Sequence, residues 1–194
     1  KEPTASSSKM AVQRAPNEDL YAILAIDMEQ KAHYDDAVVM FNVLYEKTEQ
    51  KEYLYRSLRS SVKGKKASFA LSRIDEELKK SPNDIALLRI RVDALLQLGD
   101  AAEAKKSALR LVDLTGIEND YLLVSEACGR LREYDMALKY LEGAYVKKYD
   151  EKILDKMAVV EYVNLGKKAE AIAHLETHSR LYGCSELICN RLIG

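Results

Sequence analysis

The sequence predicts an all-α fold, an α-solenoid in which helix-turn-helix units are stacked along the chain. The first observation is a repeated segment, since residues 132–145 read REYDMALKYLEGAY and residues 33–45 read HYDDAVVMFNVLY. The second is a small residue that recurs at a constant interval. The third is the composition: 47% of the residues are hydrophobic, 31% are charged and only three are proline, which is typical of a helical protein.

The recurring small residue is an alanine on the second helix of each predicted unit. It stands at Ala37, Ala70, Ala104, Ala137 and Ala171, so successive positions are 33, 34, 33 and 34 residues apart. A constant interval of about 34 residues is the sequence signature of a helix-turn-helix array. Small side chains at these positions also allow antiparallel helices to approach closely. The sequence therefore predicts one repeated design rather than a single irregular core.

The helix pairs carry a shared pattern of packing residues. In the fourth unit these are Tyr121, Val124, Ser125 and Cys128, then Ala137, Leu141 and Ala144; in the first they are Tyr21, Leu24, Ala25 and Met28, then Ala37, Phe41 and Leu44. Over about residues 18–183 the pattern resembles the tetratricopeptide repeat (TPR), although no unit has the family's Trp and only Pro82 keeps its closing proline. The resemblance implies a right-handed solenoid whose first helices form a concave wall that binds proteins or peptides.

Residues 1–16 (KEPTASSSKMAVQRAP) are expected to form a flexible leader. The segment is polar, contains Pro3, Pro16 and three consecutive serines, and lacks helical periodicity. It looks like the tether that follows the lipidated cysteine of a bacterial lipoprotein, and an arbitrary starting point of the sequence is the alternative. The tether interpretation would place a lipid anchor upstream of residue 1.

The solenoid is expected to cover residues 17–194. Asn17 is a favourable N-cap for its first helix, and Glu18 and Asp19 suit the positive end of the helix dipole. The predicted units are about 18–50, 51–84, 85–117, 118–151 and 152–183, with a capping helix at 184–194. The cap would cover the apolar face that a terminal unit leaves bare.

Glycine and proline mark the turns that separate the predicted helices. The second unit is broken at residues 63–66 (KGKK) and closes at Pro82, after which Asn83 or Asp84 can cap the next helix. The third unit turns at Gly99 and stops at Gly116. The fourth runs to residue 151, and the fifth turns at residues 165–166 (LG). Ten helices and a cap result.

Several functional classes are not indicated by the sequence. No apolar run approaches the roughly 18 residues that a membrane span requires. The formal net charge is −1, with both signs interspersed, so no field suited to nucleic acid is expected. Phosphate-binding glycine loops, nucleophile elbows and zinc-protease motifs are all absent from the sequence. We therefore expect no enzymatic activity, no cofactor and no bound metal.

The C-terminal region contains the one group of residues whose types and spacing suit a metal site. His174, Glu176 and His178 are followed by Cys184 and Cys189, and two histidines with two thiolates would supply four zinc ligands. His178, however, falls where the repeat places a packing residue. A metal site or a metal-dependent enzyme is therefore the less favoured alternative.

Cys184 and Cys189 are also a candidate disulfide. Five residues apart in one helix they would be too far apart to bond, but Gly183 can end the preceding helix and Ser185 can cap the next. A bridge would indicate an oxidising compartment, and two reduced thiols in a cytoplasmic protein are the alternative. Together with the leader, this favours a periplasmic or membrane-tethered location over the cytoplasm. Cys128 is expected to be an inert core residue.

The predicted binding surface is the concave face of the first helices. This face carries Ala22, Ile26, Tyr55, Arg59, Arg89, Asp93, Leu122, Glu126, Lys156 and Val160, with Arg56, Lys63 and Arg130 at its flank. An aromatic ring beside several guanidinium groups suits an extended peptide that carries a carboxylate or an acidic side chain. The alternative for these residues is a solvated charged face.

We expect a non-enzymatic scaffold or adaptor that binds a protein or peptide, with no nucleic-acid partner. The proposed groove residues are Tyr55, Arg56, Arg59, Arg89, Asp93, Glu126, Arg130 and Lys156. The first alternative is a structural lipoprotein domain that acts through its convex face or through self-association. The oligomeric state is not indicated by the sequence.

Overall fold

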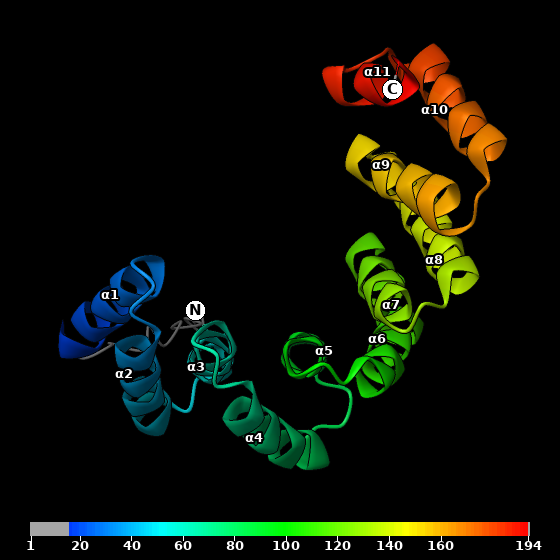
Figure 1. Cartoon of the computed structure of the whole chain (residues 1–194). Helices are drawn as coiled ribbons and strands as arrows, with labels where there is room; N and C mark the ends of the chain where they lie inside the picture. Colours follow the sequence, from blue (N-terminus) through cyan, green and yellow to red (C-terminus); the bar gives the residue numbers. More distant parts are fainter. Residues whose placement is uncertain (1–15, 194) are drawn as a thin grey trace, which may run out of the picture. The chain divides into compact units, whose positions relative to one another are not determined.

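The computed structural model describes residues 16–193, which contain eleven α-helices, one π-helical segment and no strand (Figure 1). The helices are α1 (Pro16–Gln30), α2 (Tyr34–Thr48), α3 (Lys51–Lys63), α4 (Ala67–Lys80), α5 (Ile85–Leu98), α6 (Ala101–Thr115), α7 (Glu118–Arg130), α8 (Tyr134–Lys147), α9 (Glu151–Val159), η1 (Val160–Asn164), α10 (Lys168–Tyr182) and α11 (Glu186–Ile193). The predicted leader lies outside the described residues except for Pro16, which begins α1. None of the described helices has the length and apolar character needed to cross a membrane.

The chain divides into two compact units. Unit 1 comprises residues 1–64, with α1 to α3 in its described part, and unit 2 comprises residues 65–194, with α4 to α11. The boundary falls between α3 and α4, inside the predicted 51–84 repeat.

The five predicted alanine positions are equivalent along the backbone. Ala37, Ala70, Ala104, Ala137 and Ala171 are each the fourth residue of an even-numbered helix, α2 to α10, and each is at most 4% exposed. In every case the alanine N–H donates to the carbonyl four residues earlier, just before the helix begins. Since a larger side chain would not fit at such a buried position, the alanine permits close contact between neighbouring helices.

The turns that precede these five helices share a left-handed residue two positions before the helix start. Gly99 and Gly166 adopt it with φ of 83° and 69°, and Ala32, Lys65 and Arg132 adopt it with φ of 62°, 62° and 60°. Glycine takes this conformation without steric cost, whereas other residues are strained in it. The sequence marked the turns at Gly99, Gly166 and residues 63–66, although in the last the left-handed residue is Lys65 and not the neighbouring glycine.

Unit 1 has a small core of its own. Phe41 and Leu44 from α2 are buried with Ala25 of α1 and Tyr53 of α3, and the rings of Phe41 and Tyr53 stack at 6.4 Å. Phe41 thus fills the space between successive helices, as the sequence pattern predicted. The first helix begins at Pro16, so Asn17 lies inside α1 rather than before it.

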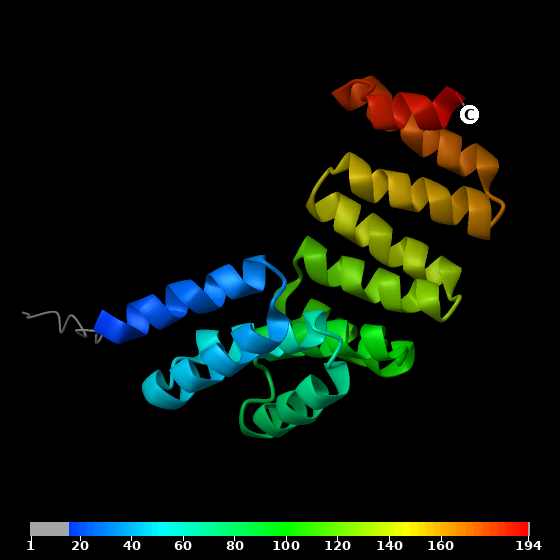
Figure 2. The same ribbon diagram turned by 60° about the vertical axis from the view of Figure 1, so that its left-hand side comes forward.

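Unit 2 stacks its helices in chain order, each antiparallel to the next (Figures 1 and 2). In Figure 1, α5, α7 and α9 form an inner row and α6, α8 and α10 an outer row. Leucine, valine and alanine side chains fill the layers between the rows, led by Leu88, Val92, Leu111 and Val124. The unit is therefore a helix-turn-helix α-solenoid, as predicted.

The last helix caps the end of unit 2. Ile188 of α11 is fully buried against Leu154, Ala158, Ala171 and Leu175 from α9 and α10. The predicted capping helix therefore covers the apolar face of the final helix pair.

The π-helical segment η1 was not predicted. It continues α9 and contains Glu161, whose carboxylate is 2% exposed and lies 3.0 Å from Nδ1 of His174. The backbone N–H of Lys167 donates to the carbonyl of Glu161. A single wide turn of this kind inserts into an α-helix without ending it.

Candidate functional site

The inner row of unit 2 carries a hollow of about 610 Å³, which we call the α5–α9 groove. Its walls come from α5, α7 and α9, with contributions from α8 and η1. Six of the residues that the sequence placed on the concave face line it: Arg89, Asp93, Leu122, Glu126, Lys156 and Val160. They are three pairs four residues apart, so each pair projects from one face of its helix. The floor is apolar and is completed by Leu123, Leu141 and Val159.

Arg89 does not project freely into the groove. Its Nε and a terminal nitrogen donate to the two carboxylate oxygens of Asp120, at 2.8 and 2.9 Å. Asp120 is fully buried in the first turn of α7, where a negative charge is favoured by the helix dipole. The hydroxyl of Thr115 also donates to Asp120. The guanidinium of Arg89 therefore holds α5 against α7, and this contact uses two of its three nitrogens.

The Arg89–Asp120 pair changes the proton affinity of both groups. Burial by itself would raise the pKa of Asp120, but the hydrogen bonds from Arg89 and Thr115 outweigh it and leave the pKa below its usual range. The hydrogen bond to Asp120 raises the pKa of Arg89. Both groups are consequently charged at neutral pH. Sequence reasoning missed this pair, because its members are 31 residues apart and on different helices.

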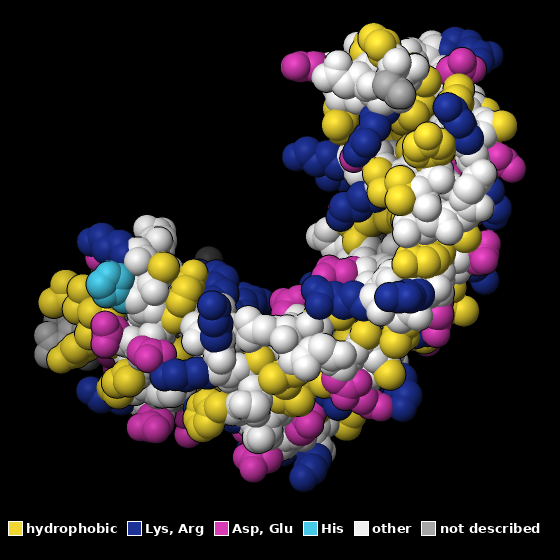
Figure 3. Space-filling view, viewed as in Figure 1, with side chains coloured by type: hydrophobic (Ala, Val, Ile, Leu, Met, Phe, Trp, Pro, Cys, Tyr) yellow, Lys and Arg dark blue, Asp and Glu magenta, His cyan; other side chains and the backbone are white. Residues whose placement is uncertain are grey.

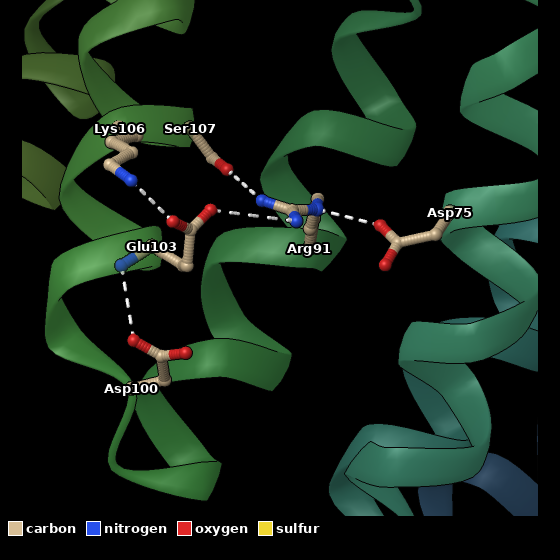
Figure 4. A network of polar contacts seen from close by, with 6 residues as sticks. All are labelled: Asp75, Arg91, Asp100, Glu103, Lys106 and Ser107. Atoms are coloured by element: carbon tan, nitrogen blue, oxygen red, sulfur yellow. Dashed lines mark hydrogen bonds and ion pairs between the residues drawn. The ribbon is translucent and has the colours of Figure 1, made fainter.

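Arg91 points away from Arg89, because residues two apart project from nearly opposite sides of a helix. Its Nε donates to Asp75 of α4 at 2.7 Å and a terminal nitrogen donates to the Ser107 hydroxyl of α6 at 2.5 Å (Figure 4). The other terminal nitrogen lies 3.9 Å from Glu103. Arg91 thus joins α5 to α4 and α6. It does so on the side of α5 opposite Arg89 and the ion pair that Arg89 makes with α7.

At the α7 wall, Glu126 and Arg130 form an ion pair. The guanidinium of Arg130 donates to Glu126 at 2.9 Å and to the carbonyl of Leu96 at 3.0 Å. Glu126 lines the groove, whereas Arg130 lies outside its lining. The second predicted guanidinium is therefore also engaged within the protein.

The α9 wall holds the groove's free cation. Lys156 is exposed, lines the groove and has no hydrogen-bond or ion-pair partner in the described part of the chain. Its neighbour Asp155 is bound by Arg191 of the capping helix, with Nε 2.5 Å from a carboxylate oxygen. The ammonium of Lys156 is thus a positive group that a guest in the groove can reach without breaking a contact within the described part of the chain.

The remaining predicted groove residues, Tyr55, Arg56 and Arg59, lie on α3 in unit 1. The guanidinium of Arg56 binds Glu29 at 3.1 Å and Glu52 at 3.2 Å, and it lies over the ring of Phe41. Tyr55 is half-buried and Arg59 is exposed. Arg56 therefore has a role within unit 1.

The C-terminal histidines do not converge. Nδ1 of His178 is 2.6 Å from the hydroxyl of Tyr145, whereas Nδ1 of His174 faces Glu161. Cys184 and Cys189 are bonded to each other, so neither thiol is available as a metal ligand. Within residues 16–193, no group of three or more His, Cys, Asp or Glu side chains is placed to hold a metal ion. The geometry therefore does not supply the four-ligand set that a zinc site would need.

Cys184 and Cys189 are joined by a disulfide with a Cα–Cα distance of 5.6 Å. Gly183 ends α10 with φ of 90°, and the Ser185 hydroxyl accepts from the N–H of Ile188 at the start of α11. These are the two features that the sequence offered for bringing the cysteines together. Cys128 is fully buried, and burial raises the pKa of its thiol.

Positive and negative side chains alternate over the visible face of the molecule (Figure 3). Neither sign gathers there into a broad patch.

Comparison with known proteins supports the fold. No protein-family profile and no curated protein matches the sequence. MamA residues 41-end from Desulfovibrio magneticus RS-1 has a similar structure, with a TM-score of 0.71 and 15% identity over 86% of this chain and 96% of that one. TTC0263, a thermophilic TPR protein in Thermus thermophilus, has a TM-score of 0.65 and 17% identity over 91% and 97%. The chain therefore has a TPR-like fold.

Proposed function

We propose that this protein is a non-enzymatic scaffold that binds a peptide segment of another protein in the α5–α9 groove. The observation that carries the proposal is the combination of an apolar floor with the exposed ammonium of Lys156 at its wall. Neither His nor Cys lines the groove, so no histidine stands among its walls to activate Ser125, the one hydroxyl in the lining. Solenoids of this type commonly use the extended concave surface for binding.

The groove favours a particular kind of guest. Leu122, Leu141 and Val160 offer apolar contact, and Lys156 offers a charge-assisted hydrogen bond to a carboxylate. Asp93 of α5 and Glu126 of α7 are acidic. We propose an extended segment with apolar side chains and an acidic group placed near α9. The sequence predicts several guanidinium groups for binding the guest, but Arg89 and Arg130 form hydrogen bonds within the protein and contribute less to that binding.

A charge-reversal pair tests the groove. Lys156→Glu should abolish capture of the partner from a lysate of the native organism, as read by mass spectrometry. Lys139→Glu makes the same change on α8, where Lys139 is exposed and outside the groove lining, and should leave capture intact. Equal capture by both variants would exclude the groove. Arg89→Glu is unsuitable, because it would also break the buried pair with Asp120.

A second candidate is contact through the outer helices or through self-association. It is favoured by large apolar side chains exposed on the outer row, notably Val146, Tyr149, Leu181 and Tyr182, each more than half exposed. Exposed aromatic and aliphatic clusters often mark interaction surfaces. Lys156→Glu would leave such contacts unchanged, so the same capture experiment separates the two candidates.

We also propose that the protein works in an oxidising compartment, such as a periplasm, as its disulfide favours. Mass measurement after alkylation, with and without reductant, tests this: both C-terminal cysteines of protein taken from its native source should be protected until reduction. Alkylation of both without reductant would indicate a reducing compartment.

A further inference from the structure

A second hollow lies between the ends of α8 and α10 and the start of α9, on different residues from the α5–α9 groove. It has a volume of about 440 Å³ and is lined by Tyr149, Glu151, His178, Tyr182 and the turn at residues 183–185. We call it the tyrosine hollow. A neighbouring apolar furrow of about 300 Å³ shares Tyr149, His178 and Tyr182 with it.

The exposed rings of Tyr149 and Tyr182 form the aromatic wall of the tyrosine hollow, and Tyr145 and His178 pack against them. Tyr145, which is largely buried, is hydrogen-bonded to His178, and its ring meets that of Tyr149 edge-on at 5.2 Å. His178 in turn packs on Tyr182 at 4.9 Å, and the rings of Tyr149 and Tyr182 lie 5.7 Å apart. Yet Tyr149 is 60% exposed and Tyr182 is 56% exposed. Two tyrosine rings are thus ordered by their neighbours while remaining open to solvent.

The carboxylates that line this wall carry its negative charge. The carboxylates that line the hollow and its furrow belong to Glu151 and Glu142, and no Lys or Arg lines either space. Lys148, next to Tyr149 in the chain, is paired with Asp150 at 3.6 Å. Glu151 accepts a hydrogen bond from the Ser185 hydroxyl on one oxygen, and its other oxygen has no partner in the described part of the chain. A carboxylate oxygen therefore remains available beside the exposed rings.

We propose that the tyrosine hollow binds an arginine side chain of a protein partner. The guanidinium would lie on the rings of Tyr149 and Tyr182 and donate to the free carboxylate oxygen of Glu151. A planar guanidinium stacks on aromatic rings and also bonds to carboxylates, so one group satisfies both features of the site. The neighbouring furrow, lined by Val146 and Leu181, would receive an apolar side chain next to the arginine.

This site takes the opposite charge from the α5–α9 groove, where the free group is the ammonium of Lys156. The inference does not depend on the groove, because the residues that line the two spaces are different. A partner could engage either site without the other.

Blocked amino acids provide a direct probe. N-acetyl-arginine N-methylamide should shift the NMR signals of the Tyr149 and Tyr182 rings with millimolar affinity, as expected for a single side chain. N-acetyl-citrulline N-methylamide has almost the same shape without the charge, and should bind about five- to tenfold more weakly. Equal binding of the two compounds, or shifts at other residues with none at these tyrosines, would overturn the proposal.

Variants identify the groups responsible. Tyr182→Leu and Glu151→Gln should each weaken arginine binding several-fold, whereas Tyr182→Phe keeps the ring and should keep the affinity. Tyr162→Leu is the matched control, since Tyr162 is 53% exposed but its ring already lies under Lys168. If Tyr182→Leu failed to fold, Glu151→Gln and the comparison with the citrulline compound would still test whether the tyrosine hollow binds arginine. Unchanged binding in Glu151→Gln, or equal loss in Tyr162→Leu, would contradict the assignment.

Discussion

Arg89 of α5 binds both carboxylate oxygens of Asp120 of α7, and Asp120 has no exposed surface. We expect Asp120→Asn to lower the free energy of unfolding by about 2–4 kcal/mol, because it leaves a guanidinium beside a neutral buried amide. Urea denaturation measures the change. Asp135→Asn is the control: Asp135 is 84% exposed and pairs with Lys167 at 3.4 Å, so its loss should change little. Equal effects in the two variants would show that Asp120 is not a structural group.

Acidification should lower the free energy of unfolding, in part through protonation of Asp120. Its pKa is lowered in the folded state, so on acidification the unfolded chain takes up the proton first. The stabilisation is complete above the unfolded pKa of about 4 and is lost as the pH falls through the lower folded value. Urea midpoints measured from neutral to acidic pH should therefore converge for the wild type and Asp120→Asn. A difference between them that stays constant with pH would contradict this.

Much of the fold could be predicted because it is encoded in local patterns. Helical periodicity and glycine or proline breaks place the helices, and the interval between Ala37, Ala70 and the later alanines places the equivalent contacts. The same periodicity indicates which side of each first helix faces inward. Six residues predicted for that side in unit 2 do line one groove.

The rest depends on geometry between helices, which spacing does not encode. The Arg89–Asp120 pair and the divergence of His174 from His178 follow from how neighbouring helices are rotated. The π-helical turn at Glu161 likewise accompanies a contact with another helix. As a result spacing indicates which residues line the groove in unit 2 but not that Arg89 and Arg130 form ion pairs within the protein.

Gly143 of α8 lies against the ring of Tyr121, on α7. A Cβ added at Gly143 would lie 2.7 Å from two ring carbons of Tyr121. Gly143→Ala should therefore destabilise by about 1–3 kcal/mol, since the ring must move within a packed layer. Gly129→Ala is the matched control, because a Cβ there meets nothing within 4 Å and should stabilise the helix slightly. In a Tyr121→Leu background the penalty of Gly143→Ala should shrink; a penalty of the same size would mean that the ring is not its cause.

Arg132 occupies the left-handed turn position that Gly99 and Gly166 fill elsewhere. We expect Arg132→Gly to stabilise by about 0.5–1 kcal/mol, because relief of the left-handed conformation exceeds the added entropy of the unfolded chain. Gly99→Ala should instead lower the free energy of unfolding, because it places a Cβ in the left-handed conformation. Arg132→Ala removes the same side chain but keeps the strained Cβ, so it should not stabilise. If Ala and Gly at position 132 gave the same thermal midpoint, the gain would not come from the backbone.

Reduction of the Cys184–Cys189 bond should loosen α11. A loop this short contributes about 2 kcal/mol by the chain-entropy estimate. Ile188, Leu192 and the Arg191–Asp155 pair also hold α11 in place. Hydrogen exchange should accelerate across α11 on adding a dithiol, with little change in α5, which packs in a different layer. The Cys184→Ser/Cys189→Ser variant should show the same pattern without reductant. Unchanged exchange in α11 would mean that Ile188 and Arg191 suffice to hold the cap.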